Sequence, residues 1–555
     1  MTKLIQTAFV VSFASLAFAG PKLAKDLPSS TSTAPINVIV QFRTPPTKDE
    51  LQQIQAYGQL KKLFNSITGA YLTVKPSAFA ALEADPNVTY VSPDRNVAGA
   101  LEYAEPTVNA NIALQYGFDG TGVGVAVIDS GILSSHPDLK TSSGSPRVVY
   151  AQDFTGTGGS GDAYGHGTHV AGIIGGNGAQ SSGNSAIFTF RGIAPKSTLI
   201  DLRVLDANGQ GTDSMVISAI DQAIALKGTY NIRVINLSLG RQVQERYTLD
   251  PLCQAVERAW NAGIVVVVAA GNNGRDNSMG TNGYSTIAAP GNDPYVITVG
   301  SMKDMSTALR ADDNIASYSS KGPTLYDRFV KPDLVAPGNN IISALAANST
   351  IVTKYPSNSV AVSYYKNGSS NNSYWYFRLS GTSMATPMVS GAAALLIQKN
   401  SMLSPDTVKA RLMKTATKNF PATSIVTDPT TGITYTSQYD MFTVGAGYLD
   451  VWAALNNNDV IAAGKMAKSV QVVRDPLTGK VTALDESILW GDSVLWGDSV
   501  VWGSNVFVNG SSVLWGDSVI WGDSTSIGFS VVWGDSVLWG DSTLFNEALS
   551  AKGEL

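Results

Sequence analysis

Five short runs rich in Val, Ile and Ala occur between residues 105 and 455, separated by stretches with helical periodicity. The runs are apolar almost throughout, which is typical of strands covered on both faces. They cover residues 123–128, 199–204, 234–239, 264–270 and 295–299. The helical stretches fall near residues 168–176, 213–227, 251–262, 384–399 and 405–416. This alternation predicts an α/β domain with a doubly wound, mainly parallel sheet, whose site lies at the carboxyl ends of the strands.

A smaller unit, residues 36–97, precedes this domain. Residues 36–42 alternate like a strand, residues 48–64 have helical periodicity, and residues 64–74 hold two β-prone runs around a hairpin signal. A short helix and a last strand are expected at 77–84 and 88–92. The order βαββαβ predicts a small α+β module of the ferredoxin-like type.

The first residues have the pattern of a secretory signal peptide. Lys3 precedes a short apolar run, and Ala17-Phe18-Ala19 is a small-x-small cleavage site. A transmembrane anchor is the alternative, but the run is shorter than the ~18 apolar residues that a span needs. We therefore expect residues 1–19 to be removed on export, and residues 20–35 to form a linker.

Composition narrows the function classes. Hydrophobic residues make up 44% of the chain and charged residues 15%, as in globular proteins with a large core. The net charge of -5 provides no overall basic field for nucleic acid. Cys253 is the single cysteine, so an intramolecular disulfide framework is excluded.

Only three histidines are present, and an enzyme that uses an imidazole must choose among them. They are His136, His166 and His169. Glycines flank His166 on both sides, which lets another group approach its ring closely. A structural pair on a helix is the alternative for His166 and His169. A metal site would need more ligands than the surrounding sequence offers.

Three further segments carry candidate chemistry, and each also has an ordinary structural explanation. Asp129 ends a core strand, where a buried carboxylate needs a partner, but it could simply cap its own turn. Ser383 opens a helix, whose free N–H groups suit a developing oxyanion or a plain N-cap. Asn272 follows another core strand and is either an amide donor or a turn residue.

Taken together, these segments resemble the subtilase family. The blocks that carry the resemblance are Ala126-Val127-Ile128-Asp129-Ser130-Gly131, Gly165-His166-Gly167-Thr168-His169-Val170-Ala171-Gly172 and Gly381-Thr382-Ser383-Met384-Ala385-Thr386-Pro387. The order Asp, His, Ser is the one known from subtilisin. The resemblance extends over residues 105–455, the expected catalytic domain.

The resemblance implies a serine endopeptidase and a role for each residue. Ser383 would be the nucleophile, His166 the general base, Asp129 its orienting partner and Asn272 an oxyanion donor. Substrate would bind as an added strand. One edge of the binding site would be Ser238, Leu239 and Gly240, and the other would be Gly209, Gln210 and Gly211. No acid lies in the segments around the expected S1 pocket, so a broad or apolar P1 preference is expected.

No cofactor is expected for catalysis. The resemblance does suggest a structural calcium ion. Asp138 matches a family calcium ligand. The loop at residues 176–183, which would supply most other ligands, departs from the family pattern. Calcium elsewhere in the chain is left open.

Residues 36–97 resemble the family's inhibitory propeptide. Such a module assists folding, blocks the active site and is removed by autocatalytic cleavage. The cut is expected within residues 95–109, where Leu101 and Tyr103 are apolar P1 candidates. The protein would then be a zymogen with its own propeptide as intramolecular inhibitor.

The last part of the chain is repetitive. A linker at residues 456–484 leads to residues 485–545, where Trp-Gly-Asp-Ser recurs at intervals of six residues or near multiples of six. Stacked short strands, a flexible segment that contacts polysaccharide or a cell surface, and calcium binding through the repeated Asp are three interpretations.

Two other functions remain open at this point. The chain could be a catalytically inactive subtilase that serves as a binding protein. It could also be a surface adhesin whose main function lies in the repeats. Labelling of Ser383 by a fluorophosphonate probe would argue against the first function. Deletion of residues 485–555 tests the second, because an adhesin should then lose its retention at the cell surface while proteolysis persists.

Overall fold

The structure is a computed structural model with two compact units, Met1–Val97 and Ala98–Leu555. It describes residues 22–24, 27–30, 32–64, 68–93, 99–100, 103–159, 161–278, 280–368, 373–428, 431–462, 464–474, 481–483 and 544–545. The expected signal peptide lies outside the described residues, as does the tail apart from Leu544–Phe545. No helix in the described part of the chain is long and apolar enough to cross a membrane.

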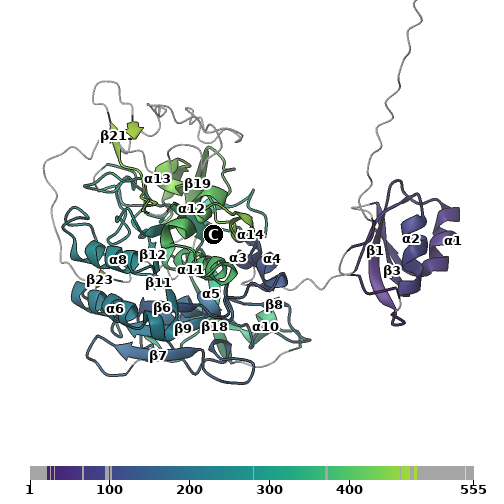
Figure 1. Ribbon diagram of the computed structural model, residues 1–555, viewed down its shortest axis with the longest axis horizontal. Coiled ribbons are helices and arrows are strands. Elements are labelled where there is room, and N and C mark those ends of the chain that lie inside the picture. The colour runs from purple at the N-terminus through teal and green to yellow at the C-terminus, as the bar shows by residue number, and fades with distance from the viewer. Residues whose placement is uncertain are drawn as a thin grey trace, which may run out of the picture. The chain divides into compact units, whose positions relative to one another are not determined.

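The first unit is a four-stranded antiparallel sheet with two helices, labelled β1, β3, α1 and α2 in Figure 1. Its elements are β1 (Ile36–Phe42), α1 (Lys48–Tyr57), β2 (Gly58–Leu63), β3 (Gly69–Val74), the 3-10 turn Pro76–Ala78, α2 (Phe79–Ala84) and β4 (Val88–Pro93). The sheet order is β2-β3-β1-β4. Val38, Leu72 and Leu82 are fully buried between sheet and helices.

The helix expected over residues 48–64 is shorter than predicted. It begins after Thr47, whose side chain and that of Glu50 form a capping box, and it ends at Tyr57. Residues Gly58–Leu63 instead form β2, paired with β3. A side chain at Gly58 would meet the Thr73 carbonyl oxygen at 2.3 Å, so glycine allows this close pairing. Leu60 and Leu63 have helical spacing, but pairing with β3 determines the structure of this segment. The sequence alone does not show which of these two effects is stronger.

The second unit is built on an eight-stranded sheet in which seven strands follow the order β14-β13-β12-β11-β6-β9-β7 and β15 pairs with β13. The strands are β6 (Gly124–Asp129), β7 (Val148–Asp153), β9 (Thr198–Arg203), β11 (Ile232–Leu237), β12 (Val265–Ala269), β13 (Ile297–Lys303), β14 (Asn314–Ile315) and β15 (Leu334–Pro337). All pairs are parallel except β13 with β14. The chain runs from β6 to β7 and β9 on one side and then crosses to β11 on the other. Their carboxyl ends therefore meet beside β6, where such sheets place a site.

Helices cover both faces of this sheet. In Figure 1, α5 and α11 lie on one side of the strands and α6 and α8 on the other. The helices of this unit are α3 (Ala104–Thr107), α4 (Ala110–Gln115), α5 (His166–Gly175), α6 (Asp213–Ala225), α7 (Lys227–Tyr230), α8 (Pro251–Asn261), α9 (Thr350–Lys354), α10 (Val362–Tyr365), α11 (Thr382–Lys399), α12 (Pro405–Thr415), α13 (Met441–Val444) and α14 (Val451–Asn456). The five strands and five helices predicted for this domain are all present. β7, β14 and β15 were not predicted, because β7 ends in polar residues and β14 and β15 are only two and four residues long.

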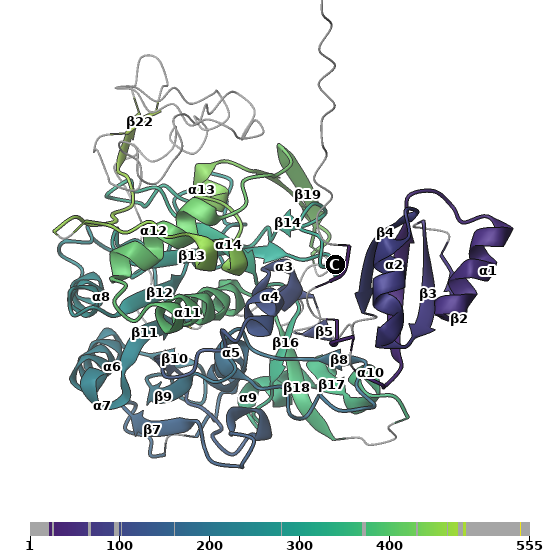
Figure 2. The same ribbon diagram turned by 45° about the vertical axis from the view of Figure 1, so that its right-hand side comes forward.

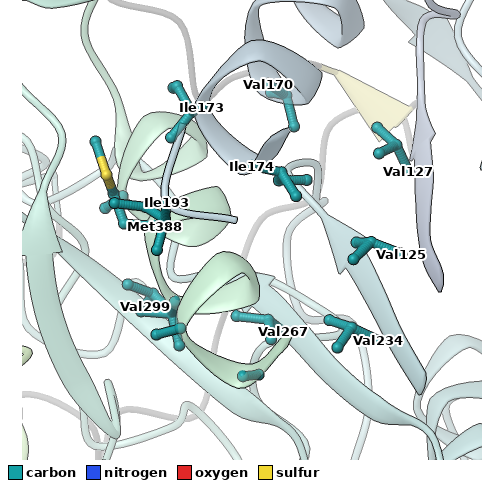
Figure 3. Packing of buried hydrophobic residues seen from close by; sticks show 14 of the residues in the cluster. Val125, Val127, Val170, Ile173, Ile174, Ile193, Val234, Val267, Val299 and Met388 are labelled. Carbon is teal, nitrogen blue, oxygen red and sulfur yellow. The ribbon is translucent and has the colours of Figure 1, made fainter. Parts of the chain in front are cut away.

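The core between the sheet and α5 and α11 is closely packed. Figure 3 shows Ile173 and Ile174 of α5 and Met388 of α11 in one buried cluster with valines of β6, β11, β12 and β13. These side chains are fully buried. Burial of a Val or Ile side chain contributes ~1.5–3 kcal/mol, so this layer holds both helices against the strand ends.

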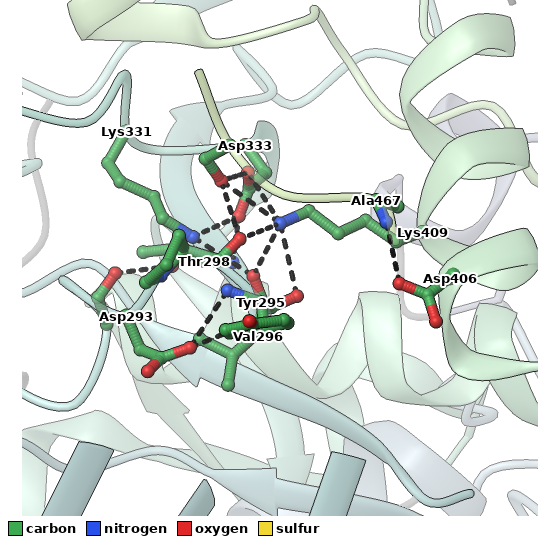
Figure 4. Close-up of polar contacts among 12 residues, drawn as sticks. Asp293, Tyr295, Val296, Thr298, Lys331, Asp333, Asp406, Lys409 and Ala467 are labelled. Carbon is green, nitrogen blue, oxygen red and sulfur yellow. Dashed lines mark hydrogen bonds and ion pairs between the residues drawn. The ribbon is translucent and has the colours of Figure 1, made fainter. Parts of the chain in front are cut away.

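A buried ionic network joins α12 to the strands at the other end of the sheet. The Asp333 carboxylate lies 2.7 Å from Lys331 Nζ and 3.2 Å from Lys409 Nζ, and all three side chains are inaccessible (Figure 4). Lys409 also donates to the carbonyl oxygens of Pro294 and Val296. Burial lowers the pKa of Lys409 to about 7, although the Asp333 carboxylate opposes the shift.

Smaller sheets complete the second unit (Figure 2). Their strands are β5 (Gly99–Ala100), β8 (Phe188–Thr189), β10 (Gln210–Gly211), β16 (Ile341–Ala344), β17 (Ser359–Ala361), β18 (Tyr374–Leu379), β19 (Thr423–Thr427), β20 (Thr434–Gln438), β21 (Val472–Arg474), β22 (Val481–Ala483) and β23 (Leu544–Phe545). β16, β18 and β17 form an antiparallel sheet. β23 pairs antiparallel with β10.

Candidate active site

Asp129 is the last residue of β6, and its carboxylate is 1% exposed. Oδ1 accepts hydrogen bonds from the Ser130 backbone N–H at 2.7 Å and from His166 Nδ1 at 2.8 Å. The sheet therefore fixes the carboxylate, and the carboxylate fixes the imidazole. A bond from Nδ1 to a carboxylate selects the tautomer in which Nε2 carries no proton.

His166 is the first residue of α5 and is fully buried. Gly165 before it has φ +104°, a conformation that favours glycine. At Gly167, a β-carbon would lie 2.2 Å from the Gly131 carbonyl oxygen. The glycines that drew attention in the sequence thus let the start of α5 lie directly against the loop after Asp129.

Asp162 is a buried residue of this site that the sequence did not reveal. Its carboxylate accepts from the Ser130 hydroxyl at 2.8 Å, from the Gly165 N–H at 2.6 Å and from the Thr168 N–H at 2.8 Å. It holds the loops on either side of the Asp129–His166 contact. An acid just before a helix start is a signal for such a contact, because helix amino ends attract negative charge.

Ser383 is the second residue of α11 and is fully buried. Its hydroxyl donates to the Ser238 carbonyl oxygen at 2.9 Å, and the Ser238 hydroxyl donates to the Ser383 carbonyl oxygen at 2.9 Å. Within the described part of the chain, no group is hydrogen-bonded to His166 Nε2. The structure thus joins Asp129 to His166 and shows the Ser383 hydroxyl turned to Ser238.

Asn272 lies beside the start of α11. Its side-chain oxygen accepts from the Thr382 N–H at 3.0 Å and from the Thr382 hydroxyl at 3.1 Å. With the oxygen held by the residue before Ser383, the amide NH2 faces away from Thr382. The Ser383 N–H is among the first N–H groups of α11, which have no partner within the helix.

The two segments expected to bind substrate lie beside these residues. Residues 238–240 follow β11, and Ser238 is bonded to Ser383 as described. Residues 209–211 contain β10, and a β-carbon at Gly209 would lie 2.7 Å from the ring of Tyr164, two residues before His166.

Small residues surround the expected S1 position. A β-carbon placed on Gly240 would lie 3.0 Å from the Ala288 β-carbon, and one placed on Gly271 would lie 3.2 Å from the same atom. Gly240 and Gly271 therefore both border Ala288, and none of the three carries a charged or bulky side chain.

This chain is similar in sequence to one family model and to several known proteins. A family model described as the subtilase family matches residues 120–466. This chain belongs to the subtilase family. Serine protease AprX of Bacillus subtilis (strain 168) is 40% identical over 381 residues, which are 66% of this chain and 78% of that protein. Subtilisin E of the same strain is 34% identical over 363 residues, 65% of this chain and 78% of that protein. Subtilisin DY of Bacillus licheniformis is 36% identical over 321 residues, 58% of this chain and 93% of that protein.

The family assignment makes the chain a subtilisin-like serine endopeptidase whose substrates are proteins and peptides. The sequence predicted that Asp129 lies at the end of a core strand, and in the structure it is the last residue of β6. Arg241 and Asp213 are further residues beside the site that the sequence did not reveal.

The surroundings of Asp138 in this subtilase do not fit a calcium ion. Its carboxylate accepts from the Tyr376 hydroxyl at 2.6 Å and from the Gln180 N–H at 2.9 Å, so donors face both oxygens. Its carbonyl oxygen accepts from the Arg147 guanidinium at 2.7 Å. Calcium prefers six to eight oxygen ligands, and a guanidinium opposes a cation. Among the described residues, no cluster of three or more His, Cys, Asp or Glu could hold a metal.

The other two histidines have structural roles. His136 accepts the Asp138 N–H at Nδ1, and its Nε2 lies 2.9 Å from the Trp375 carbonyl oxygen. His169 Nε2 lies 3.1 Å and 3.0 Å from the carbonyl oxygens of Ile341 and Phe377, so this nitrogen carries the proton. Burial, with a smaller contribution from His166, lowers the pKa of His169 to about 3.

His169 generates a prediction on acid stability. Between its ordinary pKa of 6.5 and about 3, the unfolded chain binds a proton at His169 that the folded chain excludes. The free energy of unfolding should therefore fall as the pH drops through this window, by up to ~1.4 kcal/mol per pH unit. Urea unfolding of Ser383→Ala, the variant expected from the sequence to be inactive and therefore free of self-digestion, measures this fall. Adding His169→Gln should make the pH dependence shallower, and an unchanged dependence would contradict the assignment.

Proposed function

We propose that Asp129, His166 and Ser383 hydrolyse peptide bonds through an acyl-enzyme. The carrying observation is the 2.8 Å contact of His166 Nδ1 with Asp129, which leaves Nε2 as a proton acceptor. The Ser383 hydroxyl turns from the Ser238 carbonyl to Nε2, gives up its proton and attacks the substrate carbonyl carbon. His166 passes that proton to the amine as the C–N bond breaks. Water then releases the acyl group by the same route, with His166 again as the base.

The oxyanion of each tetrahedral intermediate would be held by the Asn272 amide and the Ser383 N–H. Support comes from the Thr382 contacts that fix the Asn272 oxygen and from the position of Ser383 in the first turn of α11. Donors fixed in advance stabilise the transition state more than the bound substrate, so their effect falls mainly on kcat.

Replacement of Asn272 tests this assignment. Asn272→Leu removes the donor at similar volume and should lower kcat about 10²–10³-fold with little change in KM. Steady-state kinetics on a chromogenic peptide amide measure both constants. Asn273→Ala, in the same turn, is the matched control and should keep kcat near the wild-type value. Equal losses in the two variants would show that the turn matters only for folding.

Substrate would add as a strand between residues 238–240 and residues 209–211. The pairing of β23 with β10 supports this, because an extended segment occupies the β10 edge there. Ala288, Gly240 and Gly271 leave no charged group at the expected S1 position, so the P1 preference is broad or apolar.

A peptide library tests the P1 preference. Cleavage should occur mainly after Leu, Phe, Tyr, Met and Ala, because an apolar side chain gains by burial in a pocket lined by small residues. Mass spectrometry of the products identifies the residue before each cut. Cleavage mainly after Arg or Lys would contradict the proposal.

The first unit would be an inhibitory propeptide on a secreted zymogen. Its element order and its sheet order, β2-β3-β1-β4, are compatible with the ferredoxin-like arrangement expected from the sequence. The signal-peptide pattern of residues 1–19 supports export. Attachment of the repeats to a cell surface or polysaccharide stays an expectation from sequence, because the repeats lie outside the described residues.

Maturation offers a direct test of the zymogen. Ser383→Ala should accumulate as a precursor about 75–90 residues longer than the mature enzyme, the distance from the expected signal cleavage to residues 95–109 being of that order. Intact mass of the secreted wild type and variant gives both termini. Normal processing of the variant, expressed without other proteases, would show that the cut is not autocatalytic.

A further inference from the structure

Arg241 follows directly on residues 238–240, the first of the two segments between which substrate is proposed to bind. Its side chain is 5% exposed. Nε donates to both carboxylate oxygens of Asp213, at 2.9 Å and 3.1 Å. Asp213 lies two residues after Gly211, the end of the second segment, and is the first residue of α6. The ion pair therefore runs from one segment to the other.

The same guanidinium is anchored on a third side. Nη2 donates at 2.9 Å to Asp250, which is fully buried and caps the amino end of α8 through the Leu252 N–H. The backbone of Arg241 exchanges two hydrogen bonds with Ala289, at 3.0 Å and 2.8 Å. Arg241 thus joins the two substrate segments and the wall behind the expected S1 position.

A strand inserted between two others requires a defined gap. Neighbouring strands lie about 4.8 Å apart, so the two outer segments must be held roughly 10 Å apart. A planar guanidinium that bonds two carboxylates loses little freedom on binding and resists displacement. Solvent and side-chain entropy weaken an ion pair that is exposed on both sides. Here the Asp213 side chain is 32% exposed, but the Arg241 side chain is buried and is held by Asp250 as well.

We infer that the Arg241–Asp213 ion pair sets the spacing of the two substrate segments and thereby determines how well extended peptides bind. Both are positioning residues that act through residues 209–211 and 238–240. The inference rests on the proposed strand-like binding of substrate between these segments. Disruption of the ion pair should therefore weaken substrate binding, and more so for substrates with more residues before the scissile bond. The rate of the chemical step should not change.

The test compares two substrates in steady-state kinetics. One is an amide with at least four residues before the scissile bond, and the other is a single-residue ester that reaches only the S1 position. Asp213→Asn should raise KM for the long peptide about tenfold, which corresponds to a loss of ~1.4 kcal/mol of binding free energy. It should leave kcat, and both constants for the ester, near the wild-type values. Arg241→Lys keeps the charge but not the planar fork and should show the same pattern.

Another ion pair of α6, exposed on both sides, provides the matched control. Asp221 of α6 is bonded to Arg258 of α8, with side chains 53% and 56% exposed. Asp221→Asn should change neither substrate's constants, and thermal unfolding of each variant reports any general loss of stability. Equal changes for peptide and ester, or no change for either, would overturn the inference. If Ser383→Ala still cleaved the ester, the proposed function would fail instead, so the two failures are distinguishable.

Discussion

The contact between the Asp129 carboxylate and the His166 imidazole is the interaction on which the site depends. A carboxylate at the carboxyl end of a buried strand is costly to bury unless it is hydrogen-bonded. Here His166 Nδ1 and the Ser130 N–H provide those bonds. The first residue of α5 is thereby fixed against the end of β6, and the same bond leaves Nε2 without a proton, as its proposed role as the base requires. Asp162 reinforces this arrangement by holding the loops on both sides.

The parallel sheet brings the remaining groups to the same place. The carboxyl ends of β6, β9, β11 and β12 all lie at one edge of the sheet. Asp129 is the last residue of β6, and β10, Ser238 and Asn272 lie in the segments that follow β9, β11 and β12 respectively. The start of α11 then adds Ser383 next to Ser238 and Asn272. A single architectural constraint, parallel pairing of strands whose carboxyl ends coincide, thus gathers residues that are as much as 254 positions apart along the chain, from Asp129 to Ser383.

The sequence predicted most of this domain because its strands are apolar throughout and its helices have a clear period. The glycines around His166 and the order of the three motifs also pointed to the site. Other features depend on contacts between distant segments and leave no local pattern. β2 depends on cross-strand pairing, and the bond from Tyr376 to Asp138 depends on a segment 238 residues away. The Arg241–Asp213 pair joins the loop after β11 to the first residue of α6. The orientation of the Ser383 hydroxyl toward Ser238 likewise follows from packing rather than from sequence spacing.

The proposed chemistry requires that Ser383 is a nucleophile activated by His166. Labelling with a fluorophosphonate, followed by mass spectrometry of the digested protein, measures this reactivity. We expect one phosphonylated residue, Ser383, and a loss of labelling in His166→Ala. Labelling of a different serine, or equal labelling of Ser383 in the His166→Ala variant, would contradict it.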